Sequence, residues 1–301
     1  MTIELRAPTL DDVEALADLI NRDAEELYGE QEESVDSMRM WLTGPTLKPE
    51  TDIRVAVVDG TFRGYVDVDP DPEPIYWADL RVPPSEDDGV RVALYDWVEG
   101  RARERQGELL RFHTASVDEQ TKRMLDARQY RVIRHFYRMR IDFDGDLTKP
   151  EWPGGMTVRN ATREDAHLAY DVHQESFEEH WEHERTPFEI WAHHMLREGL
   201  FDSRLWFLVE QDNDVAAVAI CREHEAEKGL GWISVLGVRK QWRRLGLGRA
   251  LLLHCFHEFR RHGFHAAALG VDADSLTGAN RLYESAGMKV VRRSDVYEKA
   301  F

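Results

Sequence analysis

The sequence predicts an α/β chain of the α+β type, in which one fold occurs twice in tandem. Three observations predict it. The 301 residues are about twice the number that one hydrophobic core usually organises. A pattern of Arg, Thr and Asp at positions 6, 9 and 12 returns at positions 159, 162 and 165. Stretches with helical and strand periodicity then follow each copy of the pattern in the same order.

Each copy opens with a short strand and an acidic helical stretch, and then forms a hairpin of two strands. Val, Ile, Phe and Ala are frequent in the hairpin strands, which is typical of strands that are largely buried. A further strand ends near Val82 in the first copy and near Val238 in the second, 156 residues later. The hairpin strands are predicted at 53–58 and 62–68, and at 206–210 and 215–221.

Each copy closes with a short helix that leads into a basic strand rich in Val and Ile, at 124–135 and at 282–293. Between the copies, residues 144–155 have the Gly and Pro content of a linker. The expected domains are 1–144 and 156–301, joined by a linker at 145–155.

The composition limits the classes of function. The formal charge is −18 and the isoelectric point is about 5.2, which excludes a broad nucleic-acid-binding surface and would suit a cationic acceptor. The N-terminus lacks the features of a signal peptide, and no apolar run reaches the roughly 20 residues that span a bilayer. We therefore expect a cytoplasmic protein with no membrane partner. Cys221 and Cys255 lie in apolar runs and are expected to be buried free thiols.

One short segment of the second copy has the features of a phosphate-binding site. Glycines let a backbone approach a ligand closely, and the first turn of a helix presents unpaired N–H groups and the positive end of the helix dipole. Three arginines add positive charge in an otherwise acidic chain, so we expect an anion here. A β-rich run at 231–238 leads into this segment, which consists of Arg243, Arg244, Leu245, Gly246, Leu247, Gly248 and Arg249.

The helix that follows this segment has a regular apolar face. Leu247, Leu251, Cys255 and Phe259 recur every four residues, which predicts that this face is buried. The spacing is not that of a Walker loop, because no Gly-Lys-Ser/Thr follows. It is also not that of a dinucleotide fingerprint, because Leu251 stands where the third glycine would be.

Two patterns in the second copy resemble those of the GNAT superfamily of acetyltransferases. Residues 238–252 contain Arg-x-x-Gly-x-Gly after a strand, which resembles the superfamily's loop for the pyrophosphate of acetyl-CoA. Residues 275–288 contain Thr-Gly-Ala followed by Leu-Tyr-Glu-x-x-Gly, which resembles a second superfamily pattern in the expected order. The resemblance implies two tandem GNAT folds, each a mixed, mostly antiparallel sheet flanked by helices.

The resemblance also implies a function for the second copy. The expected reaction moves an acetyl group from acetyl-CoA, as cosubstrate, to the amine of a small molecule by direct attack in a ternary complex. The N–H groups of residues 244–249 would hold the pyrophosphate, and Ser275 would belong to the same site. The pantetheine arm and the thioester oxygen would be bound by the backbone of Leu236, Gly237 and Val238. The alternative is a non-catalytic or regulatory module that binds acyl-CoA, and we expect a monomer or homodimer.

Tyr283 and Glu223 are the expected catalytic side chains. By the resemblance, the Tyr283 phenol would give its proton to the departing thiolate, and a phenol with a pKa of about 10 stays protonated at pH 7. In similar family members the base is a glutamate on the fourth strand, but Trp232 occupies that position here. Glu223 is our candidate for the base, and four other candidates remain open: His224, Ser234, His173 and Glu175.

An acidic stretch at 171–194 contains several histidines and tryptophans and corresponds to the acceptor-side helices of the superfamily. Its carboxylates, with Trp181 and Trp191, would hold a cationic amine by charge and cation–π contact, although a solvated helix face explains the stretch equally well. No His-Glu-x-x-His or paired Cys/His pattern is present, so no metal is expected.

The first copy is expected to be non-catalytic. Where the second copy has its phosphate loop, the first has Glu86, Asp87 and Asp88, which would repel a diphosphate. Leu125 occupies the position that corresponds to Tyr283, so the acid is missing as well. We expect this copy to serve as a structural partner of the second.

Overall fold

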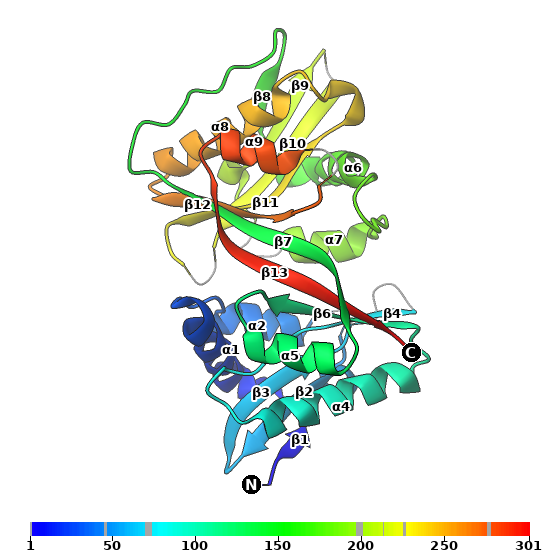
Figure 1. The fold of residues 1–301 in the computed structure, drawn as a ribbon. Coiled ribbons are helices and arrows are strands. Elements are labelled where there is room, and N and C mark those ends of the chain that lie inside the picture. The colour runs from blue at the N-terminus through cyan, green and yellow to red at the C-terminus, as the bar shows by residue number, and fades with distance from the viewer. Residues whose placement is uncertain are drawn as a thin grey trace. The chain divides into compact units, whose positions relative to one another are not determined.

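The chain divides into two compact units in a computed structural model (Figure 1). The first unit comprises Met1–Phe136 with Arg292–Phe301, and the second comprises Tyr137–Val291. The structure describes residues 2–44, 47–69, 74–196, 201–212, 214–224, 227–275 and 278–301.

The first unit contains a four-stranded antiparallel sheet in the order β1-β2-β3-β5. Beside it, β4 pairs with β6 in parallel, and β6 pairs with β13 in antiparallel orientation. Helices α1 and α4 pack on these strands through apolar faces. The elements are β1 (Glu4–Arg6), η1 (Leu10–Asp12), α1 (Val13–Tyr28), α2 (Val35–Leu42), α3 (Pro49–Asp52), β2 (Ile53–Val58), β3 (Thr61–Asp67), β4 (Ile75–Ala78), β5 (Leu80–Arg81), α4 (Asp88–Glu104), β6 (Leu109–Ala115), α5 (Glu119–Ala127) and parts of β7 (Arg131–Asp142) and β13 (Lys289–Ala300).

The second unit contains the strands β8, β9, β10 and β11 in antiparallel order, followed by β12, which runs parallel to β11. This mixed, mostly antiparallel sheet confirms the predicted fold class. Helix α8 packs on one face and α6 on the other, each with its own apolar cluster. The elements are the end of β7, β8 (Thr157–Asn160), η2 (Arg163–Asp165), α6 (Ala166–Phe177), α7 (Phe188–Met195), η3 (Ser203–Leu205), β9 (Trp206–Gln211), β10 (Asp214–Glu223), β11 (Leu230–Val238), η4 (Lys240–Trp242), α8 (Leu247–Arg261), β12 (Ala266–Asp272), α9 (Ala279–Ser285) and the start of β13.

The last strand of each copy begins in one unit and ends in the other. Met139, near the end of β7, and Phe143, which follows the strand, are buried in the apolar core of the second unit. Tyr297, in β13, is buried in the core of the first unit. Each of these 12-residue strands crosses from one compact unit to the other, so the units differ from the continuous domains expected from the sequence at 137–144 and 292–301.

The Arg, Thr and Asp pattern that revealed the duplication forms the same cluster in both units. Arg6 donates two hydrogen bonds to the carboxylate of Asp12, at 2.8 and 2.7 Å. Arg159 donates two to Asp165, at 2.9 and 2.8 Å. These charged hydrogen bonds lower the pKa of each carboxyl to about 2. The clusters fasten the first strand of each unit to the start of its first helix.

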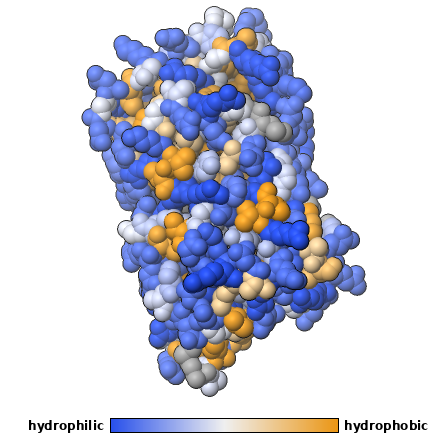
Figure 2. Space-filling model, in the orientation of Figure 1, coloured by the Kyte–Doolittle hydropathy of each residue, from blue (hydrophilic) through white to orange (hydrophobic). Residues whose placement is uncertain are grey.

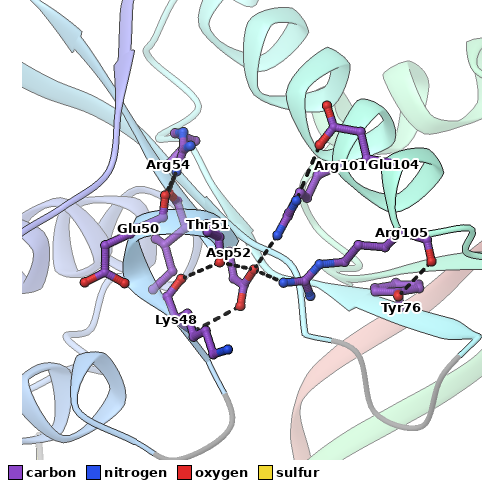
Figure 3. A network of polar contacts seen from close by, with 10 residues as sticks. Lys48, Glu50, Thr51, Asp52, Arg54, Tyr76, Arg101, Glu104 and Arg105 are labelled. Carbon is purple, nitrogen blue, oxygen red and sulfur yellow. Dashed lines mark hydrogen bonds and ion pairs between the residues drawn. The ribbon is translucent and has the colours of Figure 1, made fainter.

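The first unit also contains a buried polar network around Asp52, at the end of α3 (Figure 3). Its carboxylate accepts hydrogen bonds from the Lys48 N–H at 3.0 Å and the Thr51 hydroxyl at 2.8 Å. It also forms ion pairs with Arg101 and Arg105, at the end of α4. The network therefore joins the start of β2 to the C-terminal end of α4.

Cys221 and Cys255 are buried free thiols in the core of the second unit, with 3.8 Å between their sulfur atoms, as the sequence predicted. Figure 2 shows that hydrophilic residues cover most of the visible face and that apolar residues form small separate groups on it. In the part of the chain that the structure describes, no helix is both long and apolar enough to cross a membrane.

Candidate active site

The strands β11 and β12 separate next to the predicted binding residues. They pair in parallel only from Leu230 to Trp232, opposite Ala266 to Ala268. Strand β11 continues to Val238, and on its other side it stays paired with β10 as far as Val238. The edge of Leu236, Gly237 and Val238 that faces away from β10 therefore has no strand partner among the described residues. Unpaired backbone groups of this kind can bind an extended ligand arm as a neighbouring strand would.

A β-bulge changes which side of β11 faces each helix. The register shifts at Ser234, because Ile220 pairs with Val235 and Cys221 pairs with Ile233. Ile233 packs in the apolar cluster of α8, whereas Val235 packs in the cluster of α6. Gly237 consequently lies against α6, where a Cβ atom would be 2.9 Å from the Cβ of Ser176. Bulges often redirect side chains next to active sites.

The predicted phosphate loop leads into the N-terminus of α8. Arg244 and Gly246 have positive φ values of 63° and 84°, which turn the chain sharply before the helix begins at Leu247. Within the described residues, no acceptor pairs with the N–H groups of residues 244–249, and the first bond of the helix is Ala250 N–H to Gly246. Six successive unpaired N–H groups at a helix N-terminus suit a diphosphate.

The arginines of this loop have different environments. The Arg243 guanidinium donates to the carbonyls of Val238 at 3.0 Å and Ser176 at 2.9 Å, and it is ion-paired with Glu179. Arg243 therefore fastens the loop to the end of α6. Arg244 is exposed and Arg249 is half-buried, and neither has a partner among the described residues. These two side chains are available for an anion, whereas Arg243 is already occupied.

Tyr283 lies on α9 close to the same loop. A Cβ atom on Gly248 would be 3.3 Å from the Leu282 side chain and 3.6 Å from that of Val238, so the loop, α9 and the end of β11 meet here. Tyr283 is 8% exposed, and its hydroxyl has no hydrogen-bond partner among the described residues. Burial raises its pKa to about 12, so the phenol keeps its proton at pH 7.

Ser275, the remaining predicted binding residue, lies between β12 and α9. Its backbone N–H donates to the carbonyl of Asp272 at 3.2 Å, which closes the turn after β12. Leu276 and Thr277, which belong to the second sequence pattern, lie outside the described residues. The structure thus places Ser275 at the turn before α9, next to the helix that carries Tyr283.

The structure does not bring Glu223 to the separated strands. Glu223 pairs with Gly231, and its carboxylate accepts the Gly229 N–H at 2.8 Å. Six residues separate Gly231 from Gly237, which is about 20 Å at roughly 3.3 Å per residue. Glu223 is therefore too remote to take a proton from an amine near Gly237, and we do not retain it as the base. The sequence suggested Glu223 as the base because a sequence does not show at which end of the strand the ligand lies.

Two other base candidates are already engaged. His173 accepts a hydrogen bond on Nδ1 from the Trp191 indole at 2.9 Å, and burial lowers its pKa to about 4. Glu175 forms an ion pair with Arg239 at 2.6 Å. Trp191 is 3% exposed, in the core below α6, so the proposed cation–π contact of Trp191 with an acceptor is wrong.

Trp232 occupies the base position and contacts an arginine and a histidine ring. The Arg138 guanidinium lies 5.4 Å from the centre of the Trp232 ring, and the His224 ring lies 5.5 Å from it. Ser234, at the bulge, is half-buried. In the part of the chain that the structure describes, no group of three His, Cys, Asp or Glu residues is arranged to hold a metal ion.

The corresponding loop of the first unit is filled by its own side chains. The Asp87 carboxylate accepts the Gly89 N–H at 2.8 Å at the start of α4, in the place where an anion would bind. Arg91 is fully buried and donates to the carbonyls of Val82 and Pro83. Glu26 accepts both the N–H and the hydroxyl of Ser85. The helix terminus that corresponds to the predicted phosphate site is thus capped internally in the first unit.

The sequence and the fold resemble those of known acetyltransferases. Residues 166–288 match the model of the acetyltransferase (GNAT) family. A mycothiol acetyltransferase of Thermobispora bispora is 32% identical over 161 residues, which is 51% of this chain and 53% of that protein. One of Streptomyces griseus is 31% identical over 160 residues, covering 52% and 50%. The matched region thus spans about half the length of these curated relatives.

Solved structures match the whole chain. A GCN5-related N-acetyltransferase from Sphaerobacter thermophilus has a TM-score of 0.82 and 28% identity, covering 99% of this chain and 95% of that one. A tandem GNAT protein from the clavulanic acid biosynthesis pathway has a TM-score of 0.79 at 16% identity, covering 99% and 98%, and shows the fold alone. The chain is a tandem GNAT-fold protein. Its second unit carries a domain of the acetyltransferase (GNAT) family, at residues 166–288.

Proposed function

We propose that the protein is an N-acetyltransferase that transfers the acetyl group of acetyl-CoA to the amine of a small molecule, by direct attack in a ternary complex in the second unit. The observation that carries the proposal is the row of six unpaired N–H groups at 244–249, beside the free edge of Leu236, Gly237 and Val238. The N–H groups supply donors for the diphosphate of acetyl-CoA, and the free strand edge binds its extended pantetheine arm.

The residues of the site support the chemical steps. The amine nitrogen attacks the thioester carbonyl, and the N–H of Leu236 or Gly237 stabilises the negative oxygen that forms. The C–S bond then breaks and the thiolate takes the proton of Tyr283, whose hydroxyl has no other partner among the described residues. The attacking amine loses its proton to water, and the Tyr283 phenolate is reprotonated from solvent.

The proposal assigns no carboxylate base, because Trp232 stands in its place. Removing the proton from an alkyl ammonium with a pKa near 10 costs about 4 kcal/mol at pH 7, at roughly 1.4 kcal/mol per pH unit. The rate should therefore increase with pH toward the pKa of the acceptor. The charge of −18 and the acidic stretch at 171–194 would attract a cationic acceptor, which supports this substrate class.

The alternative is a non-catalytic module that binds acyl-CoA, and the tryptophan at the base position favours it. Release of free thiol from acetyl-CoA, measured across a panel of primary amines from pH 7 to pH 10, separates the two. Turnover that increases with pH and is lost in Tyr283→Phe supports the enzyme. Binding of acetyl-CoA without turnover of any amine over this pH range supports the module.

A further inference from the structure

The Ser176 hydroxyl is buried next to the proposed acyl site without a partner of its own. Ser176 is 4% exposed, on the last turn of α6. Its Oγ atom has no hydrogen bond within the described part of the chain. Most buried hydroxyls are paired, and a helical serine commonly bonds to the carbonyl four residues earlier. A buried hydroxyl without a partner lowers the stability of the protein relative to alanine at the same position. Its presence therefore indicates a role other than stabilising the fold.

Gly237 makes the space in which this hydroxyl lies. A Cβ atom at Gly237 would be 3.0 Å from the Ser176 Oγ and 2.9 Å from its Cβ, so any larger residue would displace the hydroxyl. Gly237 belongs to the part of β11 beyond its last pair with β12. The Ser176 carbonyl accepts a hydrogen bond from Arg243 at 2.9 Å, which fixes this turn of α6 to the phosphate loop. The hydroxyl is thereby held against the strand whose N–H groups would bind the thioester oxygen.

The first unit has a different pair at the corresponding positions. Asp23 lies 153 residues before Ser176, and Arg81 lies 156 residues before Gly237, the two intervals that relate the copies. The Arg81 guanidinium is 3.8 Å from the Asp23 carboxyl group, so these two side chains occupy this space in the first unit. In the first unit, therefore, the helix terminus is capped internally and two large side chains fill this space. The second unit has a glycine and a small hydroxyl there.

We propose that Ser176 is a catalytic residue whose hydroxyl donates a hydrogen bond to the oxygen of the bound acyl thioester. This inference rests on the proposed function, because it places the acyl group beside Gly237. The hydroxyl and a strand N–H together form a two-donor site for the oxygen that becomes negative during attack. The bond is stronger to the charged oxygen than to the neutral carbonyl, so it accelerates the chemical step more than it strengthens binding.

The test uses acetyl-CoA labelled with ¹³C at the carbonyl and the full-length protein. A hydrogen bond lowers the carbonyl stretching frequency, which is read by infrared difference spectroscopy without any acceptor. We expect a shift to lower frequency on binding to the wild type and a smaller shift with Ser176→Ala. The variant should bind CoA, which has no acyl group, within twofold of the wild type, and its kcat should decrease at least tenfold. Ser116→Ala, the same change at a half-buried position of the first unit, should leave all three values unchanged.

Each outcome decides the proposal. Equal carbonyl frequencies in the wild type and in Ser176→Ala overturn it, whatever the turnover. Ser176→Gly provides a second variant without the hydroxyl and must lose the same shift. If the wild type binds acetyl-CoA but acetylates no amine, the proposed function fails, and the carbonyl frequencies still decide the role of Ser176. If acetyl-CoA does not bind, both proposals are overturned.

Discussion

A methyl group at position 237 should strain the contact between β11 and α6. In Gly237→Ala the new Cβ would lie 2.9 Å from the Ser176 Cβ, whereas carbon atoms in contact prefer about 3.5–4.0 Å. The neighbouring Cβ is fixed to the helix backbone and is not the end of a flexible side chain, so α6 must move by several tenths of an ångström. Overpacking of this kind costs about 1–3 kcal/mol.

Urea unfolding of the wild type and Gly237→Ala measures this cost, and removal of the clashing atoms tests its origin. With Ser176→Gly, the nearest atom to the new Cβ is Val218 Cγ1 at 3.5 Å, an ordinary contact. A glycine within a helix lowers the free energy of unfolding by about 1 kcal/mol by itself. The coupling between the two sites must therefore be calculated from the full double-mutant cycle, because the stability of the double variant alone does not give it. We expect the two substitutions together to cost at least 1 kcal/mol less than the sum of their separate costs.

A matched control separates strain from the general effect of replacing glycine. A Cβ atom at Gly270, in β12 of the same unit, would have nothing within 4 Å, and the φ of this residue is one that other residues adopt. Gly270→Ala should therefore leave the unfolding midpoint unchanged or slightly higher. Additive free energies in the cycle, or equal losses in Gly237→Ala and Gly270→Ala, would refute the reasoning.

Three further predictions follow from the site and from the first unit. Arg244→Ala should raise the KM for acetyl-CoA about tenfold, with little change in the unfolding midpoint. Arg243→Ala should instead lower the unfolding midpoint, because it breaks contacts to α6. Steady-state kinetics measures the first effect and urea unfolding measures the second. Tyr283→Phe should lower kcat about 100-fold at unchanged KM, and an unchanged kcat would remove Tyr283 from the mechanism. Burial raises the pKa of Asp23 to about 7. The folded state therefore holds this proton at a higher pH than the unfolded state does, and stability decreases as pH increases from about 4 to 7, by at most about 4 kcal/mol. Asp23→Asn should match the wild type at pH 4 and exceed its unfolding midpoint at pH 8, and equal midpoints at both pH values would contradict the assignment.

The residues proposed for cofactor binding and catalysis could be located in the sequence because their patterns are local. The turn that positions the N–H groups needs Gly246 at a positive φ, and the glycine is visible in the sequence together with the strand before it and the helix after it. Tyr283 was found through a pattern within one helix and its flanking turns. The internal duplication was equally visible, because the Arg, Thr and Asp cluster lies within seven residues in each copy.

The residues that the sequence misplaced depend on contacts between distant segments. Glu223 and Trp191 have suitable chemistry, but the pairing of Glu223 with Gly231 and the burial of Trp191 under α6 remove both from the site. Ser176 was not singled out, although its offset from Asp23 provided a signal. An offset alone does not reveal that the hydroxyl meets Gly237, since 61 residues separate the two along the chain.

The sequence by itself determined that the chain contains two copies of one fold, and it located the predicted phosphate loop and Tyr283 in the second copy. These properties follow from periodicity and local turns, which need no knowledge of packing. Only the tertiary structure decided that β7 and β13 each run from one compact unit into the other, that Arg243 is occupied by Glu179 while Arg244 is available, and that a hydroxyl of α6 lies against β11. Those properties arise where segments far apart in sequence come within a few ångströms, and side-chain size and strand register set the contacts there.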